Sequence, residues 1–270
     1  MQRSVLGDHI SQQFNAELEE VRKKVLRMGG LVEEQVVKAV GALVNGDTTQ
    51  AREAVESDKR INLLELEIDE ECTQIVARRQ PAASDLRLVL TVIKMVNDLE
   101  RIGDESKRVG KMVQNELHGA ISEEMRQEVE HMGEMVRRML RRVLDAFVRS
   151  DVDTAVWVVR ADHKVDIKYE SITRQMMTYM AEDPRSIPDG LRVLWAARSM
   201  ERMGDRCQNI AEYIIYLVHG KDVRHTSFEE VLVEIEEERR ARERREQQRA
   251  AAAAKDRASP DGEGGEPPAA

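Results

Sequence analysis

Two acidic pairs at helical spacing are the residues of this chain best suited to chemistry. Glu100 and Asp104 are four residues apart, and Glu201 and Asp205 repeat that spacing further along the chain. Residues four apart lie on the same face of a helix, one turn from each other. The two carboxylates of a pair therefore point the same way, and each pair can act as one site.

Each pair lies at the edge of a helix face that the apolar pattern marks as buried. The position of Glu100 falls within a stripe made of Val89, Val92, Ile93, Val96 and Gly103. Glu201 and Asp205 lie beside Leu194 and Ala197 in the same way. A carboxylate at such an edge loses part of its hydration, so it must become protonated, pair with a base or bind a cation.

Further oxygen-bearing side chains have the same spacing on the preceding helical stretch of each half. If the two stretches are antiparallel neighbours, each half gathers three or four such side chains. Two carboxylates about 5 Å apart repel each other by roughly 3 kcal/mol at an effective dielectric of about 20, which favours a bound cation. The candidate metal ligands are Asp58, Asn62, Glu100 and Asp104 in the first half, and Asp162, Asp166, Glu201 and Asp205 in the second.

Oxygen ligands without cysteine or histidine favour hard cations such as Mg²⁺, Ca²⁺ or Mn²⁺, and iron with bridging carboxylates. Ordinary ion pairs are the alternative, because Arg101 and Arg202 directly follow the two glutamates. Gly103 and Gly204 lie in the middle of the predicted helices, where glycine costs about 1 kcal/mol relative to alanine. Glycine there allows close helix approach or exposes a backbone carbonyl, which favours a site, although close packing alone explains it too.

The stretches that carry these acids occur in two copies of one three-helix unit. A shift of 104 positions places Met28-Gly29 on Met132-Gly133, together with the apolar positions that follow. A shift of 101 positions then places Leu99–Asp104 on Met200–Asp205. The repeat predicts two similar bundles, each with its own acidic pair.

The apolar periodicity and the positions of proline predict an all-α fold of six long helices, at 8–45, 48–79, 85–117, 122–149, 152–182 and 189–219. Asp47 and Asp151 are predicted to cap the second helix of each copy, and Asp85 the third helix of the first copy. Short connections make neighbours antiparallel, so each copy is an antiparallel three-helix bundle. The predicted domains are residues 8–117, residues 118–220 and a charged tail at 221–270, partly helical and then disordered.

Composition narrows the class of protein. A net charge of −9 argues against a general nucleic-acid partner. The chain has two cysteines in no pattern, which is typical of a reducing compartment. No run of about 18 apolar residues is present, so we expect no membrane span and a cytoplasmic protein.

The chain resembles the PhoU family over about residues 8–220. The resemblance rests on Arg79–Arg87, on Leu99–Asp104 with its counterpart Met200–Asp205, and on Asn209–Glu212. It implies two three-helix bundles whose acidic motifs bind multinuclear clusters of iron or of a divalent metal such as Mn, Mg or Zn. It also implies a homodimer that acts as a negative regulator. Such a protein links the ATPase subunit of a phosphate ABC transporter to a membrane sensor histidine kinase.

The sequence departs from that family at three positions. Glu105 and Arg206 stand where the family often has histidine after Gly-Asp, and Asn62 stands where the second copy has Asp166. The last difference predicts fewer metals in the first cluster. Two other functions remain open, namely a metal-dependent hydrolase or metal-storage bundle, and an adaptor without metal. A ferritin-type di-iron centre is disfavoured, because Glu128-Val-Glu-His131 provides one Glu-x-x-His motif and its counterpart provides none.

Overall fold

A computed structural model of the chain describes residues 2–116, residues 122–223, and residues 233, 237, 240 and 244. The described residues contain α1 (Gln2–Asn45), α2 (Thr48–Arg79), α3 (Ala83–Glu116), α4 (Glu123–Arg149), α5 (Val152–Glu182) and α6 (Ile187–His219), with a short 3-10 turn at Pro184–Ser186. They contain no strand, so the predicted all-α class is confirmed. Most of the predicted tail at 221–270 lies outside the described residues.

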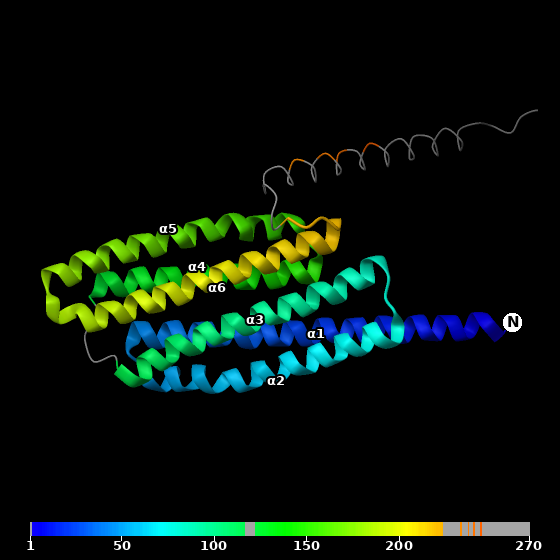
Figure 1. Cartoon of the computed structure of the whole chain (residues 1–270), viewed down its shortest axis with the longest axis horizontal. Helices are drawn as coiled ribbons and strands as arrows, with labels where there is room; N and C mark the ends of the chain where they lie inside the picture. Colours follow the sequence, from blue (N-terminus) through cyan, green and yellow to red (C-terminus); the bar gives the residue numbers. More distant parts are fainter. Residues whose placement is uncertain are drawn as a thin grey trace, which may run out of the picture. The chain divides into compact units, whose positions relative to one another are not determined.

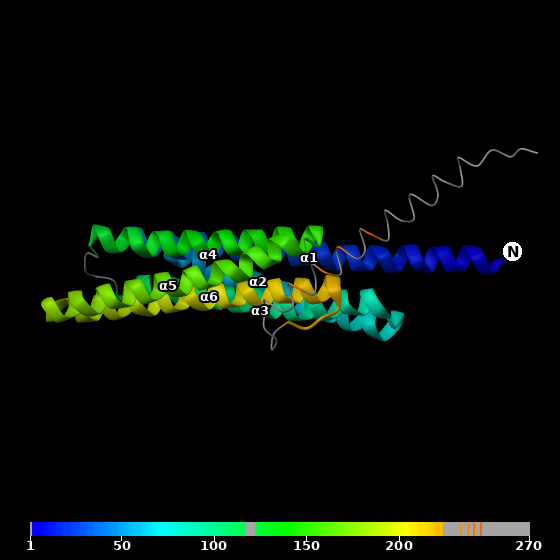
Figure 2. The same ribbon diagram turned by 90° about the horizontal axis from the view of Figure 1, so that it is seen from above.

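The helices of residues 2–223 are arranged in two layers (Figures 1 and 2). In one layer α2, α3, α6 and α5 lie side by side in that order. In the other layer α1 covers α2 and α3, while α4 covers α5 and α6. The predicted pair of three-helix bundles is therefore confirmed, and the bundles meet where α3 contacts α6 and α1 contacts α4. These helices form one compact unit, and the repeat boundaries at 8–117 and 118–220 stay a prediction.

The contact between α1 and α4 is formed by equivalent residues of the two repeats. A β-carbon added to Gly29 would lie 2.5 Å from Leu144 Cδ2, and one added to Gly133 would lie 2.5 Å from Val40 Cγ1. Gly133 is the counterpart of Gly29, and Leu144 is the counterpart of Val40, at the shift of 104 positions. The two bundles therefore pack about an internal two-fold relation, and glycine lets the two helices approach closely.

Two of the three predicted helix caps are confirmed. Asp47 Oδ1 accepts backbone hydrogen bonds of 2.8 and 3.1 Å from the first turn of α2. Asp151 Oδ1 accepts one of 3.1 Å from the first turn of α5. The prediction for Asp85 is wrong, because α3 begins at Ala83 and Asp85 lies inside its first turn. A carboxylate there still interacts favourably with the positive end of the helix dipole.

The core is made mainly of valine, leucine, isoleucine, methionine and alanine, with Phe147 as its buried aromatic ring. Methionines such as Met95, Met132 and Met203 are fully buried along the central helices. Their flexible side chains fill irregular gaps between packed helices, which suits a core with few rings. None of the described helices contains a stretch long and apolar enough to cross a membrane.

Candidate metal centre

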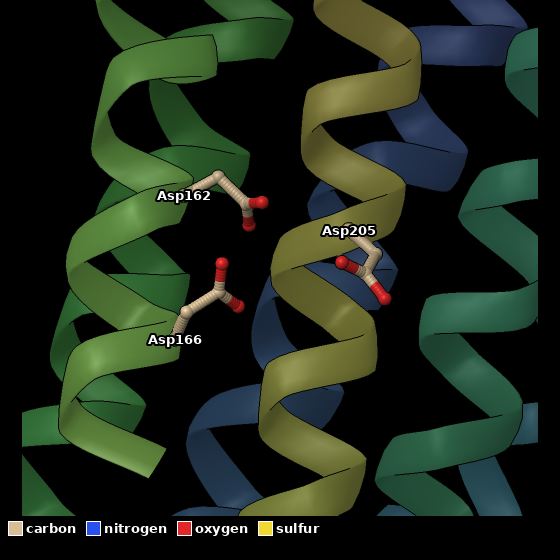
Figure 3. Close-up of side chains that lie close together, drawn as sticks. All are labelled: Asp162, Asp166 and Asp205. Atoms are coloured by element: carbon tan, nitrogen blue, oxygen red, sulfur yellow. The ribbon is translucent and has the colours of Figure 1, made fainter. Parts of the chain in front are cut away.

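Three carboxylates of the second bundle meet between α5 and α6 (Figure 3). Asp162 and Asp166 lie on adjacent turns of α5, and Asp205 faces them from α6. One oxygen atom from each of the three lies within 4.8 Å of the others. Three carboxylate oxygens at that separation can share one hard cation, which is the chemistry predicted for the second pair.

Asp162 of this cluster and the neighbouring Glu201 each hold a buried oxygen atom that has no partner among the described residues. Asp162 is only 6% exposed, and its Oδ1 accepts no hydrogen bond. Glu201 is 9% exposed, and its Oε2 is likewise without a partner, while its Oε1 pairs with Arg198. Leaving a buried polar atom unpaired costs about 1–3 kcal/mol, so the two oxygens favour a ligand.

Burial and mutual repulsion oppose the charged forms of these acids. Burial, together with the nearby carboxylates of Asp166 and Asp205, raises the pKa of Asp162 to about 7. Burial is also the main reason why the pKa values of Glu201 and Asp205 are raised. A bound cation would reverse this effect, because an opposite charge favours the ionised carboxylates.

Gly204 makes room for the cluster. A β-carbon at this position would lie 2.8 Å from Asp162 Oδ1, closer than a side chain tolerates. Its counterpart Gly103 faces Gln35 instead, at 3.0 Å from Oε1. The two mid-helix glycines therefore serve close helix approach, and in the second bundle the atom approached is a carboxylate oxygen of the candidate site.

In the first bundle, the ammonium group of a lysine lies where the second bundle could hold a metal cation. Lys107 Nζ donates to Asp58 Oδ2 at 2.6 Å and lies 3.6 Å from Asp104 Oδ1. Asn62 Nδ2 also donates to Asp58, at 3.4 Å. At the shift of 101 positions, the counterpart of Lys107 is the uncharged Gln208. The ammonium group contacts two of the acids that a metal would need, and the second bundle has no such lysine at the equivalent position.

Glu100 forms no ion pair with Lys107 and is repelled by Asp104. Burial, together with the carboxylates of Asp104 and Glu65, raises the pKa of Glu100 to about 7. Burial likewise raises the pKa of Glu65. Glu100 lies 3.7 Å from Arg101, a contact too long to satisfy it.

Glu105 and Arg206, the residues that follow the two Gly-Asp pairs, connect the bundles. Glu105 forms an ion pair of 3.3 Å with Arg202, and Arg206 forms one of 3.4 Å with Asp98. Both pairs cross the contact between α3 and α6. The side chains of Glu105 and Asp98 are mostly buried, so these pairs hold the bundles together rather than bind a metal.

Among the described residues, the predicted ligands thus divide unevenly between the bundles. The structure brings Asp162, Asp166 and Asp205 together and places Glu201 beside them. It does not assemble an equivalent three-acid group from the predicted residues of the first bundle. Sequence reasoning missed Lys107 and Glu65. Their signals were present, since Lys107 follows Asp104 by three residues and Glu65 follows Asp58 by seven, and both spacings keep side chains on one helix face.

We expect metal-free protein, prepared with a chelator, to lose thermal stability as the pH rises from about 5 to about 8. The pKa of Asp162 is about 7 in the folded chain and ordinary in the unfolded chain, so the folded chain binds more protons between those values. This stability is complete below the ordinary pKa of aspartate and is lost as the pH rises through about 7. Glu100 acts in the same direction. Thermal melts across the range test this, and Asp162→Asn should reduce the slope. A melting temperature that rises with pH would contradict it.

Comparison with known proteins covers both bundles. The PhoU domain family matches the chain twice, over residues 25–113 and 129–214. A "Phosphate-specific transport system accessory protein PhoU homolog" of Pseudomonas putida is 51% identical over 231 residues, which are 86% of this chain and 90% of the relative. The accessory protein PhoU of Escherichia coli K12 is 48% identical over 226 residues, 84% of this chain and 93% of the relative.

Solved structures give the same result. A crystal structure of PhoU from Pseudomonas aeruginosa has a TM-score of 0.75 at 50% identity and covers 77% of this chain and all of that chain (100%). A structure described as the phosphate transport system regulatory protein PhoU, from Streptococcus pneumoniae, has a TM-score of 0.72 at 30% identity and covers 78% of this chain and 99% of that chain. The names of these proteins describe accessory and regulatory roles rather than a catalytic activity.

Proposed function

This chain belongs to the PhoU family, and from that premise we propose that it is a regulatory protein of phosphate uptake. The observation that carries the proposal is the match of both bundles to accessory proteins of phosphate-specific transport systems, over nine-tenths (90%) of the relative's length. The acidic cluster, the glycine beside it and the contact between bundles all lie within the matched ranges.

We further propose that the protein is a negative regulator of the phosphate-starvation response. In this role it joins the ATPase subunit of the high-affinity phosphate ABC transporter to a membrane sensor histidine kinase, from the cytoplasmic side. It acts as a homodimer and through protein contacts. Exposed apolar side chains at equivalent positions of the two bundles support such contacts, because Leu86 and Leu90 on α3 correspond to Ile187 and Leu191 on α6.

The metal belongs, in this proposal, to the second bundle. Asp162, Asp166, Glu201 and Asp205 would hold it, because they offer oxygen ligands alone and two buried oxygens without partners. A divalent cation or iron would supply positive charge beyond the single arginine, Arg198, that pairs with Glu201. It would thereby fix α5 against α6. Lys107 performs that task for Asp58 and Asp104 in the first bundle, so we assign no metal there.

Co-purification tests the proposed contacts. Tagged protein recovered from cells grown in rich phosphate, after mild cross-linking, should bring with it the transporter's ATPase subunit and the histidine kinase. Recovery of neither partner from cells that contain both would count against the regulatory contacts. A phosphatase assay of the same preparation with Mn²⁺ and Mg²⁺ distinguishes the regulatory protein from a metal-dependent hydrolase. Metal-dependent turnover is required if the protein is a hydrolase.

A further inference from the structure

A basic hollow lies on the second bundle, away from the acidic cluster, between α4 and α5. Its volume is about 280 Å³. It is lined by the apolar side chains of Met135 and Met139, the ring of Trp157, and the cations Arg138, Arg160 and Lys164. No acidic side chain lines it. Such a concentration of positive charge is unexpected in a chain whose net charge is −9.

The tryptophan orders the cations at the rim of the hollow. The guanidinium carbon of Arg142 lies 4.0 Å from the centre of the Trp157 ring, and that of Arg138 lies 5.4 Å from it. A guanidinium stacked on a ring keeps its N–H groups free at the edge, where they can bind oxygen atoms in pairs. Trp157 thus holds two arginines ready without using their hydrogen-bond donors.

The cations of the hollow are not neutralised by the part of the chain that the structure describes. Arg138, Arg142, Arg160 and Lys164 are exposed, and none forms an ion pair with a described residue. Glu134, one turn before Arg138, is already engaged by Arg137 at 2.7 and 2.8 Å. Four neighbouring positive charges repel one another, so the arrangement lowers stability unless an anion offsets it.

The first bundle shows that the fold does not need this cluster. At the shift of 104 positions, the counterparts of Arg138, Arg142, Trp157, Arg160 and Lys164 are Glu34, Lys38, Glu53, Glu56 and Arg60, in that order. There the charges are mixed, and Lys38 pairs with Glu34 at 2.8 Å and with Glu53 at 3.0 Å. In the second bundle the three glutamates are replaced by Arg138, Trp157 and Arg160. The same helix pair therefore folds with a balanced surface in one copy and with a purely cationic one in the other.

We propose that this hollow binds a free, multiply charged phosphate compound. Arginine forks match the paired oxygens of a phosphate group, and charge-assisted hydrogen bonds of this kind are about twice as strong as neutral ones. A volume of about 280 Å³ suits a small anion, since pockets for larger organic ligands start at roughly 300 Å³. The phosphate groups of membrane lipids share this chemistry, and the test separates the two sources.

Tripolyphosphate is the probe, and the fluorescence of Trp157 is the signal. The chain has two tryptophans, so the full-length Trp195→Phe protein reports on Trp157 alone. We expect a saturable change on titration. The variant Arg138→Glu with Arg160→Glu introduces into the second bundle the two glutamates that the first bundle has at the equivalent positions, Glu34 and Glu56. We expect it to bind at least about tenfold more weakly.

The matched control is Arg52→Glu with Lys59→Glu, which makes the same change in net charge at two exposed positions of α2. It should bind tripolyphosphate within about twofold of the parent, whereas a loss equal to that of the Arg138 and Arg160 variant would reveal a general charge effect and overturn the proposal. Equal binding by all three proteins, or no saturable binding by the parent, would also overturn it. So would binding to phosphatidylglycerol vesicles without binding to tripolyphosphate, since the hollow would then serve a membrane surface. Thermal melts confirm that each variant is folded.

Discussion

Asp162→Asn combined with Asp205→Asn is expected to abolish metal binding at the proposed site between α5 and α6. Asparagine keeps the shape of each side chain but removes the two charges that attract the cation. Loss of two direct ligands should lower affinity by more than the roughly 10- to 100-fold that loss of an outer-shell partner costs. Elemental analysis of purified protein and calorimetric titration with Mn²⁺ measure the effect. In chelator, the same variant should melt at a higher temperature than the parent, because fewer like charges remain.

The internal repeat provides the control. Asp58→Asn with Asp104→Asn changes the equivalent positions of the first bundle, where Lys107 contacts both acids and we propose no metal. This variant should keep its metal and lose stability on the order of 1–3 kcal/mol, since a partly buried ammonium is left without its partners. If it loses metal, or if the variant of the second bundle keeps metal, the assignment to α5 and α6 is wrong.

The helices and their pairing could be predicted from the sequence because they depend on local signals. The apolar period, the prolines between helices and the capping aspartates are all visible in a single chain. The one cap that failed shows the limit. Asp85 has the right side chain for a cap, but α3 begins two residues earlier at Ala83, and the side chain alone does not show which residue of the first turn starts the helix.

The positions of the acidic residues could be predicted from the sequence, but the basic side chains that pair with them could not. Spacing places Asp104 and Asp205 at equivalent points of two helices, and it gives no distance to a base on the same face. The structure adds that distance, 2.6 Å from Lys107 to Asp58, and so gives the first cluster a cation from its own chain. The second cluster lacks such a lysine, and its buried Asp162 is left with an unpaired oxygen.

Cells that lack this protein are expected to express phosphate-starvation genes even in rich phosphate. The reason is that a negative regulator reports a sufficient supply, and without it the kinase receives no such report. Residues 1–220, which contain both bundles, should restore repression in those cells. If the full-length chain alone restores it, the segment from Lys221 onward belongs to the signalling surface, and the predicted functional boundary at residue 220 is wrong.

The most direct measurement is therefore a reporter driven by a starvation promoter, read in rich phosphate in three strains that carry the full-length protein, residues 1–220 or no protein. A regulatory role predicts low reporter activity in the first two strains and high activity in the third. Low activity in the strain without the protein would contradict the regulatory role itself, whatever metal the second bundle binds.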